Sequence, residues 1–242
     1  MKHAPSGEPV STCVQLLGRP RISGAGTYQL RSRKSWSVLA YLLLGERPPT
    51  RSQLAGLLFA QADDPGRALR WSLNEIRRAL GPGTVLEGDP VLLRVPDATV
   101  IDVRVLTRGA WIDAVGLPGL GADLLEGVTL QGAPGYDTWL LSQQRHLNAV
   151  SEAILHEAAL GSMSIGELQT ALGYAVRLVG MNPLDENHQA LLIRLYRLLG
   201  DDPAAQRQLD ACVELFDREL GVPPGIAIEA ATRESRYERL QT

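Results

Sequence analysis

The sequence predicts a mainly α-helical protein with a small β component, and three observations lead to this fold class. The chain of 242 residues is 45% hydrophobic and 21% charged, which is ordinary for a globular protein of one or two domains. Residues 12–106 combine short β-like runs with three helical patterns. From Tyr136 onward the chain is helical almost throughout, with short breaks at Gly and Pro.

Runs of β-favouring residues predict several short strands in the first of these regions. The expected strands are CVQLLG (13–18), RIS (21–23), TYQL (27–30), the hairpin VLEG-DP-VLLRV (85–95) and the run VIDVRVL (100–106). The glycine pair in Gly24-Ala25-Gly26 is a turn signal between the second and third strands.

Three helices are expected between these strands, and local capping signals mark their ends. The first covers about 33–45, before a pair of prolines. The second begins at Thr50-Arg51-Ser52-Gln53, which fits a capping box. The third is Pro65–Leu80, with Asp64 as its N-cap and Gly81 as its stop. The predicted order is therefore strands, three helices and a hairpin.

The rest of the chain predicts a connection followed by an all-α array. Residues 107–135 are rich in Gly, with one short helix expected near 108–114. Helices are then expected at about 137–160, from a capping box at Ser164, from Asn182-Pro183 to Gly200, from Asp202-Pro203 to Gly221, and after Pro223-Pro224-Gly225. Small residues followed by Pro resemble the tetratricopeptide pattern, and an ordinary bundle is the alternative. The expected domain bounds are 12–106, 107–135 and 136–242.

Charge is distributed unevenly along the chain. The net charge is −3, but residues 12–105 hold 13 basic and 8 acidic side chains, whereas residues 106–242 hold 10 basic and 18 acidic ones. A basic region joined to an acidic one indicates an anionic partner for the basic region only. Chance segregation of charge is the alternative.

The sequence lacks the motifs of several classes of protein. Cys13 and Cys212 lie far apart, and no Cys/His cluster occurs, so we expect neither a disulfide framework nor a metal site. His156-Glu157 begins like the zinc motif HExxH, but Leu160 stands at its second histidine. Phosphate-binding loops and nucleophile motifs do not occur either, so we expect no enzyme and no cofactor.

Membrane insertion and secretion are not expected. The longest apolar run, Val38–Leu44, is far shorter than the roughly 18 residues that a membrane-spanning helix needs. Residues 1–11 contain no apolar signal segment. A cytoplasmic protein is therefore expected.

The third predicted helix has two chemically different faces. At about 100° per residue, Leu69, Leu73, Ile76 and Leu80 fall on one apolar stripe. The other face and its flank carry Arg67, Arg70, Trp71, Asn74, Arg77 and Arg78. Arg and Asn make paired contacts to guanine and adenine in the major groove, and an exposed Trp is costly without a partner. This face predicts a helix that reads DNA, and a solvated polar face is the alternative.

Further basic residues fit the same docking on DNA. Arg31, Arg33 and Lys34 lead into the first helix, Arg51 lies in the first turn of the second helix, and Arg94 lies on the hairpin. Each is expected to reach phosphate, although each alone is also an ordinary surface residue. About 6–10 phosphate contacts would make binding steeply dependent on salt.

Two stretches of sequence resemble a known family of regulators, over about 13–235. LRSRKSWSVLAYLLLGERPPTRSQLAGLLF and GRALRWSLNEIRRALG resemble the OmpR-type winged helix-turn-helix of the Streptomyces antibiotic regulatory protein (SARP) family. LLEG, YDTWLLSQQRHL and ALGYAVRLVGMNPLDENHQALLIRLYRLLGDDPAAQRQLDACVELFDRELGVPP resemble the bacterial transcriptional activator domain that follows it. The wing strand, DPVLLRVPD, departs from the family because it lacks the usual Gly-Tyr, and Arg94 is the obvious substitute.

The resemblance implies a winged helix-turn-helix domain followed by a tetratricopeptide-like activator domain. It implies an activator of secondary metabolism that binds direct repeats near a promoter and recruits RNA polymerase. The helix Pro65–Leu80 would enter the major groove. The turn before it would contact polymerase through Phe59, Gln61, Asp63 and Asp64.

The expected partners are promoter DNA, RNA polymerase and a second copy of the chain, either as a homodimer or side by side on DNA. An interaction adaptor whose winged helix no longer reads DNA is the alternative function. A regulator switched by a small molecule held in the helical array is a third.

Overall fold

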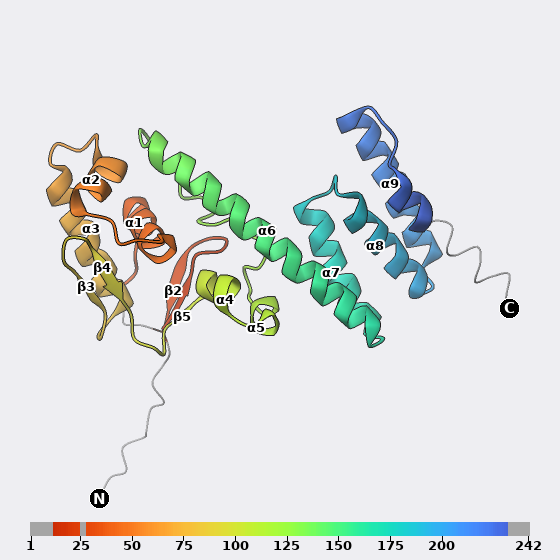
Figure 1. Cartoon of the computed structure of the whole chain (residues 1–242), viewed down its shortest axis with the longest axis horizontal. Helices are drawn as coiled ribbons and strands as arrows, with labels where there is room; N and C mark the ends of the chain where they lie inside the picture. The colour runs from red at the N-terminus through yellow and green to blue at the C-terminus, as the bar shows by residue number, and fades with distance from the viewer. Residues whose placement is uncertain (1–11, 25–27, 232–242) are drawn as a thin grey trace, which may run out of the picture. The chain divides into compact units, whose positions relative to one another are not determined.

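The structure is a computed structural model that describes residues 12–24 and 28–231 (Figure 1). The expectations for residues 1–11, for Ala25 and Gly26 in the turn, and for Thr27 lie outside these residues. The chain divides into two compact units, Met1–Asn148 and Ala149–Thr242. The predicted fold class is confirmed, since a small sheet and helices are followed by a helical array.

The first unit begins with a three-stranded sheet. Its strands are β1 (Cys13–Gln15), β2 (Arg21–Ser23) and β5 (Val100–Ile101), in the order β2-β1-β5. β1 is antiparallel to β2 and parallel to β5. β1 is shorter than the predicted 13–18, because residues 16–18 lie outside the strand. The strand predicted over 27–30 is wrong over its described residues, since 28–30 form no strand.

The prediction of a strand over 100–106 is wrong beyond Ile101. Helix α4 (Asp102–Arg108) begins at the next residue. The carboxylate of Asp102 accepts the backbone N–H groups of Leu16 and Leu17, both at 2.8 Å. These bonds replace strand pairing at the end of β1, and they turn the chain into a helix.

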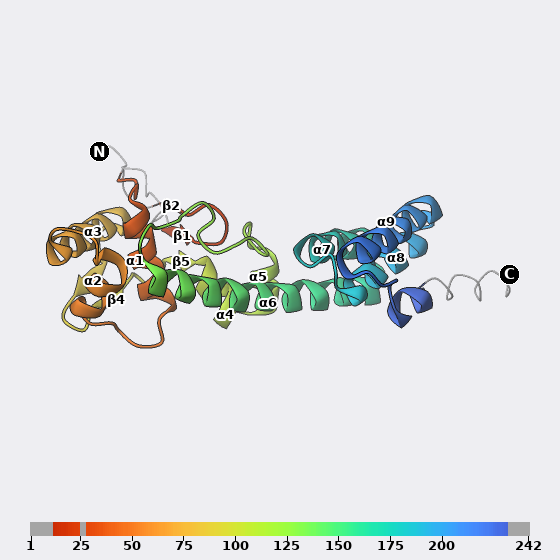
Figure 2. The same ribbon diagram turned by 90° about the horizontal axis from the view of Figure 1, so that it is seen from above.

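Three helices pack together in the first unit, with the bounds that the capping signals predicted. They are α1 (Arg33–Leu44), α2 (Arg51–Phe59) and α3 (Pro65–Leu80). Thr50 and Gln53 form the reciprocal capping box, and Asp64 accepts the N–H of Arg67 at 2.8 Å. β3 (Val85–Glu87) and β4 (Leu92–Arg94) form an antiparallel hairpin, in which β3 contacts α3 and β4 contacts α1. Figure 1 shows the hairpin beside α3, and Figure 2 shows the same unit from above.

The segment 107–135 packs into the first unit. It contains the end of α4 and the short helix α5 (Trp111–Val115) rather than a helix at 108–114. The N–H of Gly18 donates to the carbonyl of Asp123, and the N–H of Leu125 donates to the carbonyl of Leu16, both at 2.8 Å. These bonds attach the segment to the end of β1.

Helix α6 (Pro134–Ser164) is longer than the predicted 137–160. Gly161 does not end it, because one glycine inside a helix costs only about 1 kcal/mol. The capping box predicted at Ser164 is wrong. Ser164 is the last residue of α6 and donates to the carbonyl of Gly161 at 2.7 Å. The next helix begins only at Leu168.

The start of α6 packs in the first unit through aromatic rings. The ring centres of Tyr41 and Trp139 are 4.7 Å apart, and those of Tyr136 and Trp139 are 5.5 Å apart. Burial raises the pKa of Tyr136 to about 12. These rings attach the first turns of α6 to α1.

The second unit is the predicted tetratricopeptide-like array. It contains α7 (Leu168–Met181), α8 (Glu186–Leu198), α9 (Asp202–Leu220) and a further helical segment over 226–231. α7 packs on α8, and α8 packs on α9. Small side chains such as Ala190 and Ala205 share their core with Ile193, Cys212 and Phe216, which lets the helices approach closely. Within the described residues, every helix is too short or too polar to cross a membrane.

Candidate nucleic-acid interface

Helix α3 carries the candidate interface, and its apolar stripe determines which face of the helix is buried and which is exposed. Leu69, Leu73, Ile76 and Leu80 are all buried, as the spacing predicted. Burial of this stripe turns the opposite face of α3 to the surface. Arg67, Arg70 and Asn74 are exposed there, and Trp71 is 57% exposed.

The one acidic side chain within α3, Glu75, is turned away from this face. Glu75 is 3% exposed. Its carboxylate accepts hydrogen bonds from the Ser35 hydroxyl, from the Tyr28 hydroxyl at 3.3 Å and from the N–H of Arg31 at 3.3 Å. The carboxylate therefore lies at the N-terminus of α1, where the helix dipole favours negative charge. The exposed face of α3 is left with basic and neutral side chains.

Sequence reasoning missed this role of Glu75. Its partners lie 40 to 47 residues before it in the chain, so no local pattern indicates the contact. The weak signal was that Glu75 is the single acid in a helix with four arginines.

Two of the predicted DNA-contacting arginines are engaged within the protein. Arg77 donates to the carbonyl of Leu86 in β3 and to Oδ1 of Asn74 at 3.4 Å. The guanidinium of Arg78 lies 4.3 Å from the ring centre of Tyr28, a cation–π contact. Arg77 therefore holds the hairpin against α3, and Arg78 packs on the chain before α1.

Among the residues predicted to contact phosphate, some are exposed and others are in contact with groups of the protein itself. Arg33 and Arg94 are exposed. Lys34 is half-buried, with its Nζ 5.0 Å from the ring centre of Phe59. Arg51 donates from Nε to the carbonyl of Gly88 at 3.0 Å. Arg51 therefore supports the turn of the hairpin.

The turn of the hairpin is acidic at its surface. Glu87 and Asp89 are both exposed, and Asp89 accepts the N–H of Arg51 at 2.9 Å. Arg94 is the single basic side chain in residues 85–95. This hairpin offers phosphate little attraction beyond Arg94.

The turn between α2 and α3 borders a hollow of about 840 Å³ beside the start of α3. Phe59 is 2% exposed and packs inside the unit, at the edge of this hollow. Asp64 is committed to capping α3. Gln61 and Asp63 are exposed. Gln61 also packs against Gly132. A Cβ atom added at Gly132 would lie 2.0 Å from Nε2 of Gln61, so a larger residue at 132 would collide with this side chain.

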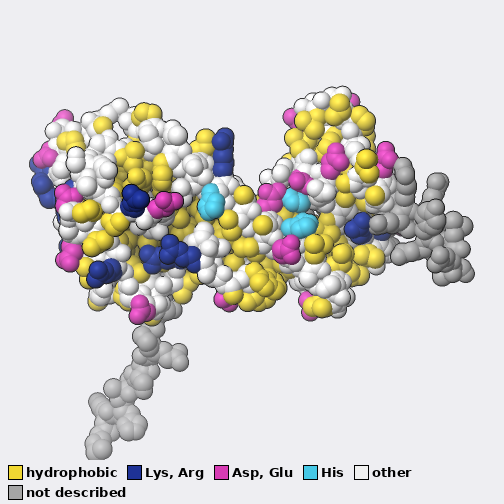
Figure 3. All heavy atoms as spheres, in the orientation of Figure 1, with side chains coloured by type: hydrophobic (Ala, Val, Ile, Leu, Met, Phe, Trp, Pro, Cys, Tyr) yellow, Lys and Arg dark blue, Asp and Glu magenta, His cyan; other side chains and the backbone are white. Residues whose placement is uncertain are grey.

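Figure 3 shows one face of the molecule, on which most of the visible Lys and Arg side chains lie over the first unit. This distribution agrees with the excess of basic residues over 12–105. The basic side chains are thus on the same unit as α3.

The sequence matches the bacterial transcriptional activator domain over residues 98–236, more than half of the chain. The chain belongs to this family. The matched residues cover α4 to α9, and they begin after the exposed face of α3.

One solved structure also resembles this member of the bacterial transcriptional activator domain family. It is Mycobacterium tuberculosis EmbR in complex with low affinity phosphopeptide, with a TM-score of 0.61 and 17% sequence identity. The match covers 94% of this chain and 65% of that chain, so this chain spans less than two thirds of it. At this identity the likeness shows the fold alone. No curated protein has a significantly similar sequence.

Proposed function

We propose that the chain is a sequence-specific DNA-binding activator of the SARP kind, which binds direct repeats near a promoter and recruits RNA polymerase in the cytoplasm. Residues 12–106 would bind DNA, and the array over 136–242 would contact other proteins. The observation that carries the proposal is the exposed face of α3. It presents Arg67, Arg70 and Asn74, while Glu75 is buried.

The chemistry of this face suits the major groove. Arg70 would make a paired contact to guanine, and Asn74 would make one to adenine. Trp71 offers an exposed apolar surface for a thymine methyl group or a sugar. Arg33, Arg67 and Arg94 would neutralise phosphates and fix the position of α3 on the duplex.

Salt dependence tests whether α3 binds DNA. The affinity of the full chain for a labelled duplex is measured by fluorescence anisotropy at several salt concentrations. Replacing Arg67 and Arg70 by Ala should weaken binding and flatten the dependence of log K on log salt by about 1, because Arg67 contacts a phosphate, whereas Arg70 contacts a base. Ala at Arg108 and Arg145, two exposed arginines outside α3, changes the net charge equally and should have little effect. Equal losses in the two double variants would contradict docking through α3.

Recruitment of polymerase is tested at the turn after α2. Asp63 is exposed beside the groove at the start of α3, where a bound activator would present it to polymerase. In transcription from a bound promoter in vitro, Asp63→Ala should lower transcript yield without changing DNA affinity. Asp113→Ala, at an exposed acid of α5, is the control. A transcript yield of Asp63→Ala equal to that of the parent would contradict a contact between this turn and polymerase.

An adaptor that does not read DNA is a second candidate. The acidic hairpin turn and the internal contacts of Arg51, Arg77 and Arg78 favour it. It predicts that the α3 variants leave DNA binding unchanged. The salt titration therefore separates the two functions.

A further inference from the structure

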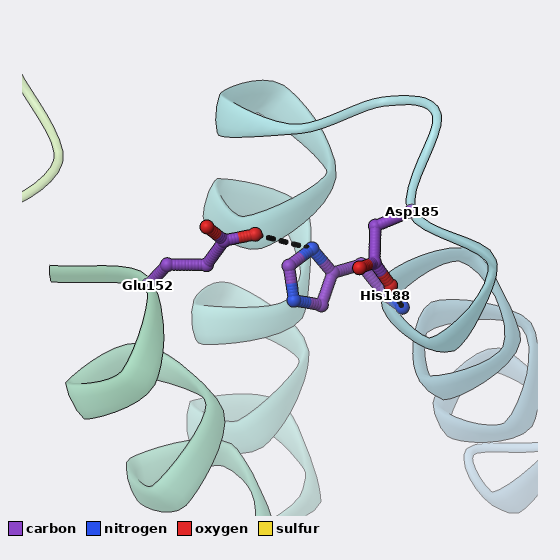
Figure 4. A group of neighbouring side chains, drawn as sticks. All are labelled: Glu152, Asp185 and His188. Carbon is purple, nitrogen blue, oxygen red and sulfur yellow. Dashed lines mark hydrogen bonds and ion pairs between the residues drawn. The ribbon is translucent and has the colours of Figure 1, made fainter. Parts of the chain in front are cut away.

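A group of metal-ligating side chains comes together in the second unit. Glu152 of α6, and Asp185 and His188 at the start of α8, each place one ligand atom within 4.8 Å of the others (Figure 4). Figure 4 shows Glu152 extending towards the ring of His188, with Asp185 at the turn where α8 begins. The ligands come from two helices, and 36 residues separate Glu152 from His188, so no sequence motif indicated them.

His188 is buried without a hydrogen bond for its Nδ1 atom. The residue is 5% exposed, and Nδ1 has no hydrogen-bond partner among the residues that the structure describes. Oε1 of Glu152 lies 3.4 Å from Nδ1. A buried polar atom without a hydrogen bond is costly, and a metal ion held between Nδ1 and the carboxylates would remove that cost.

The two carboxylates are held in place by neighbouring groups. Oδ1 of Asp185 accepts the N–H groups of Asn187 at 2.8 Å and His188 at 3.1 Å, which cap α8. The Asn182 amide donates to Oε1 of Glu152 at 3.3 Å. Such supporting bonds orient the ligands of metal sites.

The cluster is open to a ligand from the surface. It borders a hollow of about 650 Å³ that is also lined by His156. The ring centres of His156 and His188 are 6.2 Å apart. Two imidazoles on one Zn²⁺ ion, each bound at ≈ 2.0–2.1 Å, have ring centres about 5–6 Å apart. A small rotation of His156 would therefore supply a fourth ligand. Figure 3 shows histidine side chains beside acidic ones on the surface of this unit.

We propose that Glu152, Asp185 and His188 bind one divalent transition-metal ion such as Zn²⁺, with His156 or water as the fourth ligand. Imidazole together with carboxylates suits this class of ion, whereas Ca²⁺ and Mg²⁺ prefer sites made of oxygen alone. The bound ion ties α6 to the start of α8. It therefore stabilises the second unit, and above the dissociation constant this stabilisation grows with the logarithm of the free metal concentration.

Cobalt and zinc titrations of the untagged full chain test this proposal. Co²⁺ should give the visible absorbance of a four-coordinate ion at one equivalent, and Zn²⁺ should displace it and raise the thermal midpoint. Glu152→Gln keeps the size of a side chain that is only partly buried, so it should fold, which circular dichroism checks. Losing an outer partner of a metal site costs about 10–100-fold in affinity, and we expect Glu152→Gln to lose at least as much.

Matched variants identify the ligands. His188→Gln should abolish the absorbance. His146→Gln, at an exposed histidine of the first unit, and Cys13→Ser should bind like the parent. If His188→Gln does not fold, the loss of metal binding in Glu152→Gln and Asp185→Asn tests the proposal instead. Absence of stoichiometric binding, or binding that Glu152→Gln leaves unchanged, would overturn the proposal and leave the cluster as a contact between His188 and Glu152 alone.

Discussion

At the scale of single residues, Glu75 connects the stability of the first unit to the charge of its candidate interface. Its carboxylate accepts from Ser35, Tyr28 and Arg31, so it joins α3 to the start of α1. The same burial removes a negative charge from the face that carries Arg67 and Arg70. One side chain thus serves packing and electrostatics together.

Glu75→Ala should lower the free energy of unfolding by about 1–3 kcal/mol, because it leaves buried donors without an acceptor. Urea unfolding measures the change. Glu87→Ala removes an exposed acid of the hairpin and should stay within about 0.5 kcal/mol of the parent. If both variants lowered the free energy of unfolding by the same amount, the buried hydrogen bonds of Glu75 would contribute no more to stability than an exposed acid does.

At the scale of elements, local signals fixed the helices better than the strands. Asp64 and Pro65 start α3, and Gly81 ends it. Each of these signals lies in the helix or next to it in the sequence, so it can be recognised without knowing the fold. The run VIDVRVL looked like a strand because its side chains favour β structure. It became mainly helix because Asp102 binds the amides of Leu16 and Leu17, some 85 residues away, which no local pattern reveals.

The pH dependence of stability tests the role of Asp102. Burial raises its pKa above the ordinary value of 3.8, and the N–H groups of Leu17 and Leu16 oppose this without cancelling it. The folded state therefore binds the proton more tightly than the unfolded state. The resulting stabilisation is complete below pH 3.8 and is lost as the pH rises through the raised pKa.

Asp102→Asn removes this titration, while its amide oxygen can still accept the two N–H groups. Urea unfolding of both proteins from pH 4 upward should show the parent losing stability relative to Asp102→Asn, with a constant difference once Asp102 is ionised. Asp97→Asn, at an exposed aspartate, should run parallel to the parent. A difference that is flat from pH 4 would mean that the pKa of Asp102 is not raised.

At the scale of the whole molecule, the sequence predicted the fold class and the charge division, but not the distribution of contacts. The apolar stripe of α3 follows from periodicity alone, so its exposed face was predictable. Which arginines on that face are free was not, because Leu86 and Tyr28 reach Arg77 and Arg78 only through the fold. The cluster of Glu152, Asp185 and His188 was unpredictable for the same reason.

Selection of bound sequences from a random duplex pool tests the central claim most directly. The full chain at near-physiological salt should enrich a short motif repeated at about 10–10.5 bp. On that motif, Arg70→Ala and Asn74→Ala should each weaken binding by about 1–3 kcal/mol, whereas Arg145→Ala should not. No enriched motif, with only weak salt-sensitive binding, would contradict the assignment of α3 as a DNA-reading helix and favour the adaptor.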